Sequence, residues 1–251
     1  DTHDDPATEA KVVAALRERR LDGLILAPSA GAATVLDRLA RTGLPTVLVD
    51  RSPDPRFDSV CSENVKPMAQ LVLHLAQRGH RRIGMVAGMP GLTTSEERVT
   101  GYRKGLAAAG LPEMPELLVR GDSDAVRTHA AVDGLLDLPE PPTAIVAAQN
   151  TMVIATMRAV QARGLSVPRD VAVVGFDDFE WADVFSPRLT TVAQDAGAIG
   201  AMAVKLLLRR IAGTATAPRS VRIPATVQHR ESCGCVRDVS PRPSRDVGPL
   251  A

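Results

Sequence analysis

The regular alternation of short apolar runs with amphipathic segments constrains the fold of this chain more than any other feature. Runs such as 23–26, 83–86 and 171–174 are too short for buried helices and are typical of strands covered on both faces. Between the runs, apolar residues recur at helical spacing, as they do from residue 68 to residue 75. Alternating strands and helices with short connections predict an α/β fold in which helices flank mostly parallel sheets.

Composition narrows the class of protein. The chain has 251 residues, of which 45% are hydrophobic and 24% charged, as in an ordinary soluble globular protein. Its net charge of +1 provides no basic field for nucleic acid, and its 2% of aromatic residues argue against a base-stacking platform. No apolar run approaches the ~18 residues that a membrane span requires. The acidic start lacks an initiator Met and is unlike a signal peptide, so we interpret the sequence as beginning inside a longer protein.

Three cysteines, Cys61, Cys233 and Cys235, argue against a disulfide framework and fit a reducing, cytoplasmic location. The Cys233-Gly234-Cys235 motif resembles half of a metal site, but no matching Cys or His pair stands near it in the sequence. The five histidines show no zinc-binding spacing either. We therefore interpret the cysteine pair as a chance occurrence at a strand end and expect no metal site.

Two carboxylates, Asp177 and Asp178, follow the apolar run 171–174 after Gly175 and Phe176. In open α/β sheets, ligands bind outside the carboxyl ends of the strands, and both side chains are predicted to lie there. The alternative is that Asp178 caps the next turn. We favour ligand binding for Asp177 and capping for Asp178.

Arg98 and Gln149 each follow another predicted strand. Because the carboxyl ends of parallel strands meet at one edge, both side chains can face the same crevice as Asp177. A guanidinium, an amide and a carboxylate together suit a small polar ligand with several hydroxyls or an anionic group. The alternative for Arg98 is a solvated helix face, or a salt bridge to Glu96 or Glu97.

The common motifs of nucleotide binding and catalysis are absent from the sequence. It contains no Gly-x-Gly-x-x-Gly, no Gly-x-x-x-x-Gly-Lys-Ser/Thr and no Gly-x-Ser-x-Gly. Nothing in the pattern pairs a nucleophile with a base. We therefore predict neither a cofactor nor a catalytic residue.

Several stretches in one order resemble the LacI family of bacterial transcription regulators. They are GHRRIGMVAG at 79–88, ERVTGYR at 97–103, VPRDVAVVGFDD at 167–178, SPRLTTV at 186–192 and RESC at 230–233. The resemblance extends to about residue 235. Several motifs at consistent spacing make it far more specific than any one of them.

The resemblance implies a two-lobed fold like that of the type I periplasmic binding proteins, with the effector in the cleft between the lobes. Residues 1–78 with 195–223 would form the N-terminal lobe, and 79–194 with 224–235 the C-terminal lobe. The first lobe would lack its first strand–helix–strand and would therefore be incomplete. The helix-turn-helix headpiece would be absent, and residues 236–251, rich in Pro, Ser and Arg, would form a disordered tail.

The resemblance also implies a set of ligand-binding positions: Arg98, Asp177, Gln149, Asn64, Thr94, Ser123 and Gln194. Asn64 stands where an aspartate is common in the family, and Gln149 with Asn150 where Asn-Asp is common. Ser123 stands where a bulky aromatic residue often covers the ligand. These departures predict a less acidic and less aromatic cleft, so the class of effector stays open.

Three functions compete. The first is the effector-sensing domain of a cytoplasmic repressor, which binds a small polar effector such as a sugar and acts as a homodimer. Operator DNA would be bound only through the missing headpiece, and no membrane would be involved. The second is the solute-binding protein of a transporter, on the same fold. The third is an α/β enzyme with Asp177 or Asp178 as its base, for which no supporting motif is present.

Overall fold

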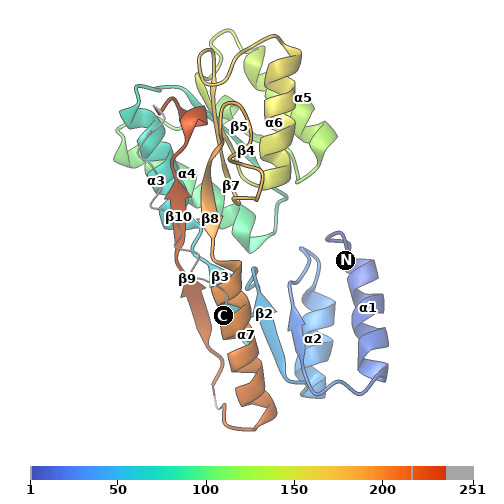
Figure 1. Ribbon diagram of the computed structural model, residues 1–251. Coiled ribbons are helices and arrows are strands. Elements are labelled where there is room, and N and C mark those ends of the chain that lie inside the picture. Colours follow the sequence, from blue (N-terminus) through green and yellow to red (C-terminus); the bar gives the residue numbers. More distant parts are fainter. Residues whose placement is uncertain (1, 216, 236–251) are drawn as a thin grey trace, which may run out of the picture.

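The computed structural model describes residues 2–215 and 217–235, which form two α/β lobes stacked end to end (Figure 1). Each lobe contains one sheet with helices on both faces, as the alternating sequence pattern predicts. In the described part of the chain, no helix is long and apolar enough to cross a membrane. The predicted disordered tail, 236–251, lies outside the described residues.

The N-terminal lobe is built on a four-stranded parallel sheet in the order β1-β2-β3-β9. Val47 and Leu48 of β2 point to opposite faces, because side chains alternate along a strand. Leu48 packs with α1 and α2, and Val47 packs with α7. The elements of this lobe are α1 (Pro6–Glu18), β1 (Leu24–Leu26), α2 (Ala33–Thr42), β2 (Thr46–Val49), β3 (Asp58–Ser62), α7 (Ala196–Ile211) and β9 (Ser220–Ile223).

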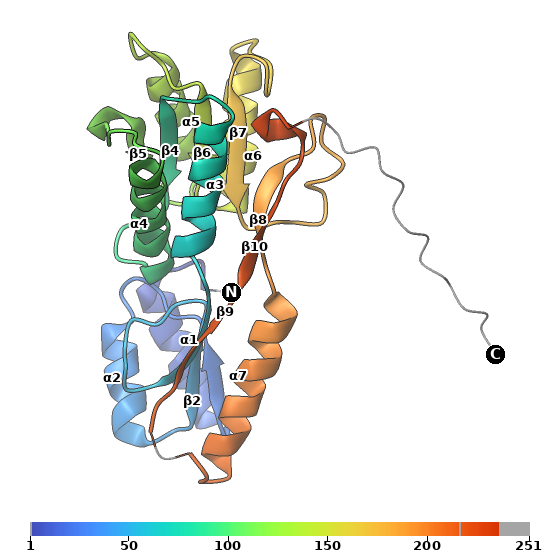
Figure 2. The same ribbon diagram turned by 90° about the vertical axis from the view of Figure 1, so that its left-hand side faces the viewer.

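The C-terminal lobe is built on a six-stranded sheet in the order β10-β8-β7-β6-β4-β5, in which only the β10–β8 pair is antiparallel. Helices α3 and α4 pack together on one face, and α5 and α6 on the other (Figure 2). Every residue of β4, β6 and β7 is buried, as expected for strands covered on both faces. The elements are α3 (Val65–Gln77), β4 (Ile83–Ala87), α4 (Thr93–Ala108), η1 (Pro115–Leu117), β5 (Leu118–Arg120), α5 (Ala125–Leu136), β6 (Ala144–Ala147), α6 (Asn150–Ala162), β7 (Ala172–Phe176), β8 (Thr190–Gln194), β10 (Ala225–Gln228) and η2 (Glu231–Cys233).

The chain passes between the lobes at residues 63–64, at Asp195 and at Pro224. Two side chains tie the lobes together beside these connections. Arg222 of β9 pairs with Glu97 of α4, with Arg222 Nη1 2.8 Å from Glu97 Oε2. The same Arg222 Nη1 donates to the Ser62 carbonyl oxygen at 3.2 Å, at the end of β3. The two lobes are therefore joined by an ion pair as well as by the three backbone connections.

The predicted lobe boundary at residue 78 is wrong, because α3 belongs to the C-terminal lobe. Periodicity correctly predicts the helix and its end at Gly79, which has a φ of 97°. Its apolar stripe, which includes Met68 and Leu75, packs into the core of the second sheet with α4, β4 and β10. A helical stripe shows which face of a helix is buried but not which sheet buries it.

Two strands differ from what the local sequence pattern suggests. Strand β3 (Asp58–Ser62) is fully buried, although Pro53 and Pro55 just before it are typical of a loop. Strand β7 (Ala172–Phe176) continues past the apolar run 171–174 and through Gly175. A Cβ at Gly175 would lie 2.0 Å from Val153 Cγ2, so the glycine allows α6 to approach β7 closely.

Candidate functional site

Arg98 is the centre of a polar network at the junction of the lobes. Its side chain projects from the start of α4 and is only 6% exposed. The guanidinium donates to Asn64 Oδ1 at 3.0 Å, to the Ala148 carbonyl oxygen at 2.7 Å and to both carboxylate oxygens of Asp177 at 3.2 Å. It also lies over the Phe176 ring, 3.9 Å from the centroid. The alternatives of a solvated Arg98 or a salt bridge to a neighbouring glutamate are therefore wrong.

Asp177 occupies the first position after β7, as predicted, with a φ of 69°. Aspartate tolerates this left-handed conformation better than most residues. The turn directs the carboxylate towards Arg98 in a paired, two-pronged contact. Gln194 at the end of β8 donates its side-chain amide to the same carboxylate. Residues of α4 and β8, together with the turn after β7, therefore position the Asp177 carboxylate.

Asn64 supports Arg98 from the first connection between the lobes. Its side chain is fully buried, accepts from Arg98 and donates to Glu97 Oε2 at 2.8 Å. Because Glu97 also pairs with Arg222, the network continues from Arg98 to the charged tie between the lobes. Asn64 and Gln194 do not line the cleft but hold the two charged groups that do.

Ser123 and Gln149 also line the cleft. Gln149 follows β6 at the N-terminal end of α6, and Ser123 follows β5 with a φ of 59°. Ser123 Oγ donates to Gln149 Oε1 at 2.6 Å. Gln149 and the nearly buried Thr94 of α4 both line the cleft.

The cleft itself has a volume of about 70 Å³ and is lined from both lobes. Five of the seven sequence-predicted residues line it: Arg98, Asp177, Gln149, Thr94 and Ser123. The N-terminal lobe contributes Asp50 and Arg51, which follow β2. This pair is not among the residues that the sequence predicts to bind the ligand. The signal that identifies it is the one used for Asp177, a charged residue directly after a predicted parallel strand.

Asp50 is an acid of the cleft whose carboxyl has a shifted pKa. Burial raises the pKa of its carboxyl above the ordinary value, and the nearby Arg98 and Arg51 oppose that rise. Arg51 is itself paired with Asp4 and donates to the Pro28 carbonyl oxygen at 3.1 Å. Asp50 has a φ of 64°, so it turns into the cleft in the same conformation as Asp177.

Asp178 faces away from the cleft. It accepts from both terminal nitrogens of Arg230 at 2.8 Å and from Thr191 Oγ1 at 2.6 Å. Burial alone would raise the pKa of the Asp178 carboxyl, but the bonds from Arg230 and Thr191 outweigh it and hold that pKa below its ordinary value. Asp178 therefore fastens the segment after β10 to the start of the loop after β7, and its capping role stays a prediction.

The arrangement offers carboxylates, a guanidinium, hydroxyls and an amide within a small, mostly enclosed space. Such groups can bind several hydroxyls of one ligand at once. Asp177 and Asp178 are both held in ion pairs, so neither is placed as a free base. The residue types that line the cleft are compatible with binding a small polar molecule.

Comparisons with known proteins identify the family. Residues 72–233 match the family described as the periplasmic binding protein-like domain. The chain is 34% identical over 215 residues to the HTH-type transcriptional repressor PurR of Aliivibrio fischeri, a match that covers 84% of this chain and 64% of the repressor. The chain thus spans less than two thirds of that relative's length.

Solved structures agree with the sequence match. The complex of the transcriptional regulator CelR with cellobiose superposes with a TM-score of 0.84 at 31% identity, and covers 91% of this chain and 71% of CelR. A regulatory protein of the LacI family from Chloroflexus aggregans superposes with a TM-score of 0.80 at 27% identity, and covers 92% of this chain and 82% of that one. The chain therefore belongs to the LacI family of transcription regulators, whose periplasmic-binding-protein-like domain it contains.

Proposed function

We propose that this chain is the effector-sensing part of a LacI-type regulator and binds a small polar effector, such as a sugar, in the cleft between its lobes. The observation that carries the proposal is the Arg98–Asp177 pair, which stands at the cleft wall and is held by residues from both the lobe core and the lobe connection. Four hydrogen bonds from the guanidinium stay within the protein. Since arginine has five N–H donors, one remains for a ligand oxygen.

Binding would change the arrangement of the lobes. A cleft of about 70 Å³ is far smaller than the roughly 300–1,000 Å³ of typical small-molecule sites. A sugar therefore requires the lobes to move apart around the connections at 63–64, Asp195 and Pro224. That movement would bias a symmetric cytoplasmic dimer and so reach the operator through a DNA-binding part outside this sequence.

Two observations favour sensing over solute transport or catalysis. The relatives PurR and CelR are transcription regulators by name, and the CelR structure holds a disaccharide. The acids that an enzyme would need as bases are both engaged in ion pairs. A regulator with a polyhydroxylated effector accounts for the cleft with the fewest additional assumptions.

A ligand panel with one matched pair of variants tests the proposal. Thermal unfolding of the full chain is measured with monosaccharides, disaccharides, sugar phosphates and purines, and at least one polyhydroxylated compound is expected to raise Tm. Gln149→Ala should reduce that shift, because Gln149 lines the cleft. Gln161→Ala, an exposed glutamine at the far end of the same helix, should not.

The proposal is contradicted if no polyhydroxylated compound shifts Tm at millimolar concentration. It is equally contradicted if Gln149→Ala and Gln161→Ala respond to the ligand as the unaltered chain does.

A further inference from the structure

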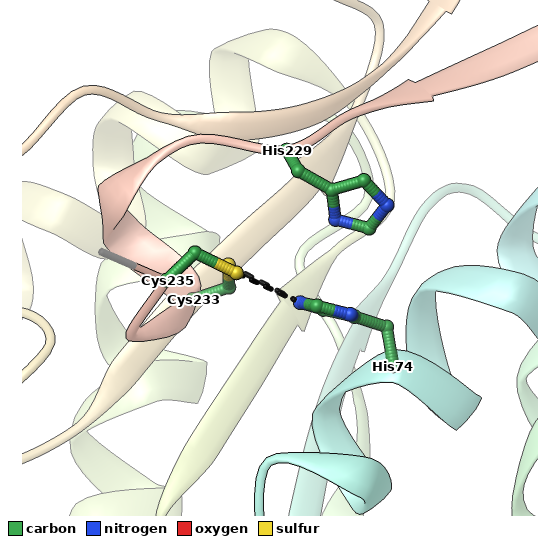
Figure 3. A group of neighbouring side chains, drawn as sticks. All are labelled: His74, His229, Cys233 and Cys235. Carbon is green, nitrogen blue, oxygen red and sulfur yellow. Dashed lines mark hydrogen bonds between the residues drawn. The ribbon is translucent and has the colours of Figure 1, made fainter. Parts of the chain in front are cut away.

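Four side chains from distant parts of the sequence converge at the carboxyl end of α3: His74, His229, Cys233 and Cys235, here called the Cys/His cluster (Figure 3). His74 lies on α3, His229 follows β10, and the cysteines lie in and just after η2. One potential ligand atom from each lies within 4.8 Å of all the others. Spacing along the chain gave no sign of this group, because His74 is 159 residues from Cys233.

The distances within the Cys/His cluster approach those of a tetrahedral metal site. His74 Nε2 lies 3.4 Å from Cys233 Sγ and 3.3 Å from Cys235 Sγ, and the two sulfurs are 3.1 Å apart. With Zn–S bonds of about 2.3 Å and Zn–N bonds of about 2.0 Å, tetrahedral ligands stand roughly 3.5 Å apart for N–S and 3.8 Å for S–S. The N–S distances already fit, and the sulfurs need to separate by only about 0.7 Å.

We propose that the Cys/His cluster binds one Zn²⁺ ion, with His74, His229, Cys233 and Cys235 as its four ligands. Two thiolates and two imidazoles in a tetrahedral arrangement are a preferred set for zinc among divalent metals. Four protein ligands leave no open position, so the site is structural. Hydrogen bonding alone explains the convergence poorly, because a thiol is a weak donor and both sulfurs point to one imidazole nitrogen.

The local backbone is arranged to present both sulfurs on one side. Gly234 between the cysteines has a φ of 81°, a conformation that favours glycine. Arg78, just after α3, donates to the Gly234 carbonyl oxygen and so holds the turn against the helix. A groove of about 580 Å³ beside α3 and β10 is lined by both histidines, so a metal ion has a route from solvent.

The position of the Cys/His cluster indicates what the ion does. The segment 229–235 is held to β8 on one side by hydrogen bonds such as that from Thr190 N to Ser232 Oγ at 2.8 Å. On the side of α3, the zinc would fasten the same segment to His74. All four ligands belong to the C-terminal lobe, so the ion stabilises that lobe and does not bridge the cleft.

Metal content and cobalt substitution test the proposal without any variant. The full chain is produced in zinc-supplemented medium and purified without chelator. Elemental mass spectrometry is expected to find one zinc ion per chain. Replacement by Co²⁺ should give the visible absorption of a tetrahedral site and a thiolate-to-cobalt charge-transfer band. Chelation should lower Tm, and added Zn²⁺ should restore it.

Matched variants locate the ligands. Cys235→Ser and His229→Ala should lose the thiolate-to-cobalt band or bind zinc at least tenfold more weakly, and their Tm should become insensitive to chelator. Cys61→Ser, in the other lobe, and His129→Ala, whose side chain is 41% exposed on α5, should keep full zinc content. His229 is exposed, so its replacement leaves the core intact if a cysteine variant fails to fold.

The proposal is overturned if the unaltered chain holds no zinc after zinc supplementation and gives no tetrahedral cobalt spectrum. It is also overturned if the intact mass of the freshly purified chain shows a Cys233–Cys235 disulfide in place of bound metal. Equal zinc content in His229→Ala, Cys235→Ser and the two control variants would overturn it as well.

Discussion

The cleft and the Cys/His cluster are both polar groups assembled from distant segments, but their chemistry is satisfied in different ways. In the cleft, each charged group already has a protein partner, and the network runs through Asn64 and Glu97 to Arg222 of the other lobe. In the Cys/His cluster, four ligand atoms point at one another within a single lobe. The first pattern suits a ligand that competes for partners and shifts the lobes, and the second suits an ion that fixes one lobe.

This difference predicts how each region responds to change. In the cleft, removing one partner leaves another charge buried without compensation, so single substitutions propagate. At the Cys/His cluster, stability depends on the free concentration of a metal, so the conditions matter more than any neighbouring side chain. Three variants and one binding measurement separate these behaviours.

Asp177→Ala should have the largest effect on stability. The substitution removes the carboxylate that pairs with Arg98, a residue that is only 6% exposed. Loss of one partner of a buried ion pair lowers the free energy of unfolding by about 3–5 kcal/mol. As a control, Glu113→Ala breaks the exposed ion pair between Glu113 and Arg103 of α4. It should lower the free energy of unfolding by less than about 1 kcal/mol. Urea unfolding followed by circular dichroism measures both. Equal costs would show that the cleft pair is no more interdependent than a surface pair.

Arg222→Ala should have a moderate effect on lobe arrangement and a small one on stability. It removes the interlobe pair with Glu97, so the ligand-free chain should populate more open forms and show a larger radius of gyration in small-angle X-ray scattering. Effector affinity should change by several fold, within the roughly 1–3 kcal/mol range of allosteric coupling. Zinc removal, in contrast, should leave the radius of gyration unchanged. A scattering profile that responds to zinc but not to Arg222→Ala would reverse the assigned roles of the two regions.

Asp178→Asn should have the smallest effect, and one that depends on pH. Asp178 lies between the two regions and pairs with Arg230, and its pKa is lowered in the folded state. A lowered carboxyl pKa contributes stability that is present above the unfolded pKa of about 3.9 and is lost as the pH falls through the folded value. The variant should therefore unfold at a lower Tm near pH 7, and the difference should narrow below about pH 4. A difference in Tm that is constant with pH would contradict the assigned ion pair.

Much of the cleft could be predicted from sequence because its residues obey a local rule. Asp177 and Gln149 directly follow apolar runs, and parallel strands place such positions at one edge. Asp50 obeys the same rule, because it directly follows β2, but Pro53 and Pro55 after it are typical of a loop and obscure the pattern. The same prolines obscure the buried strand β3.

The rest depends on tertiary packing that no local pattern contains. Helix α3 has a clear apolar stripe, but only the packing of Leu75 against the second sheet shows that it belongs to the C-terminal lobe. That assignment also places His74 beside the segment after β10, where it meets Cys233 and Cys235. No histidine pair stands near the cysteines in the sequence, but the fold brings His74 and His229 within 4.8 Å of them.

The central claim is that Arg98 anchors an effector in the cleft, and titration calorimetry tests it most directly. The best ligand from the panel is titrated into the unaltered chain, into Arg98→Ala and into Arg103→Ala, each first shown by circular dichroism to be folded. Arg103 stands one turn further along the same helix and pairs with Glu113 at the surface. We predict that Arg98→Ala weakens binding by about 100-fold, close to the ~3 kcal/mol of a lost charge-assisted hydrogen bond, while Arg103→Ala binds as the unaltered chain does. Equal affinity in folded Arg98→Ala and Arg103→Ala would contradict the account.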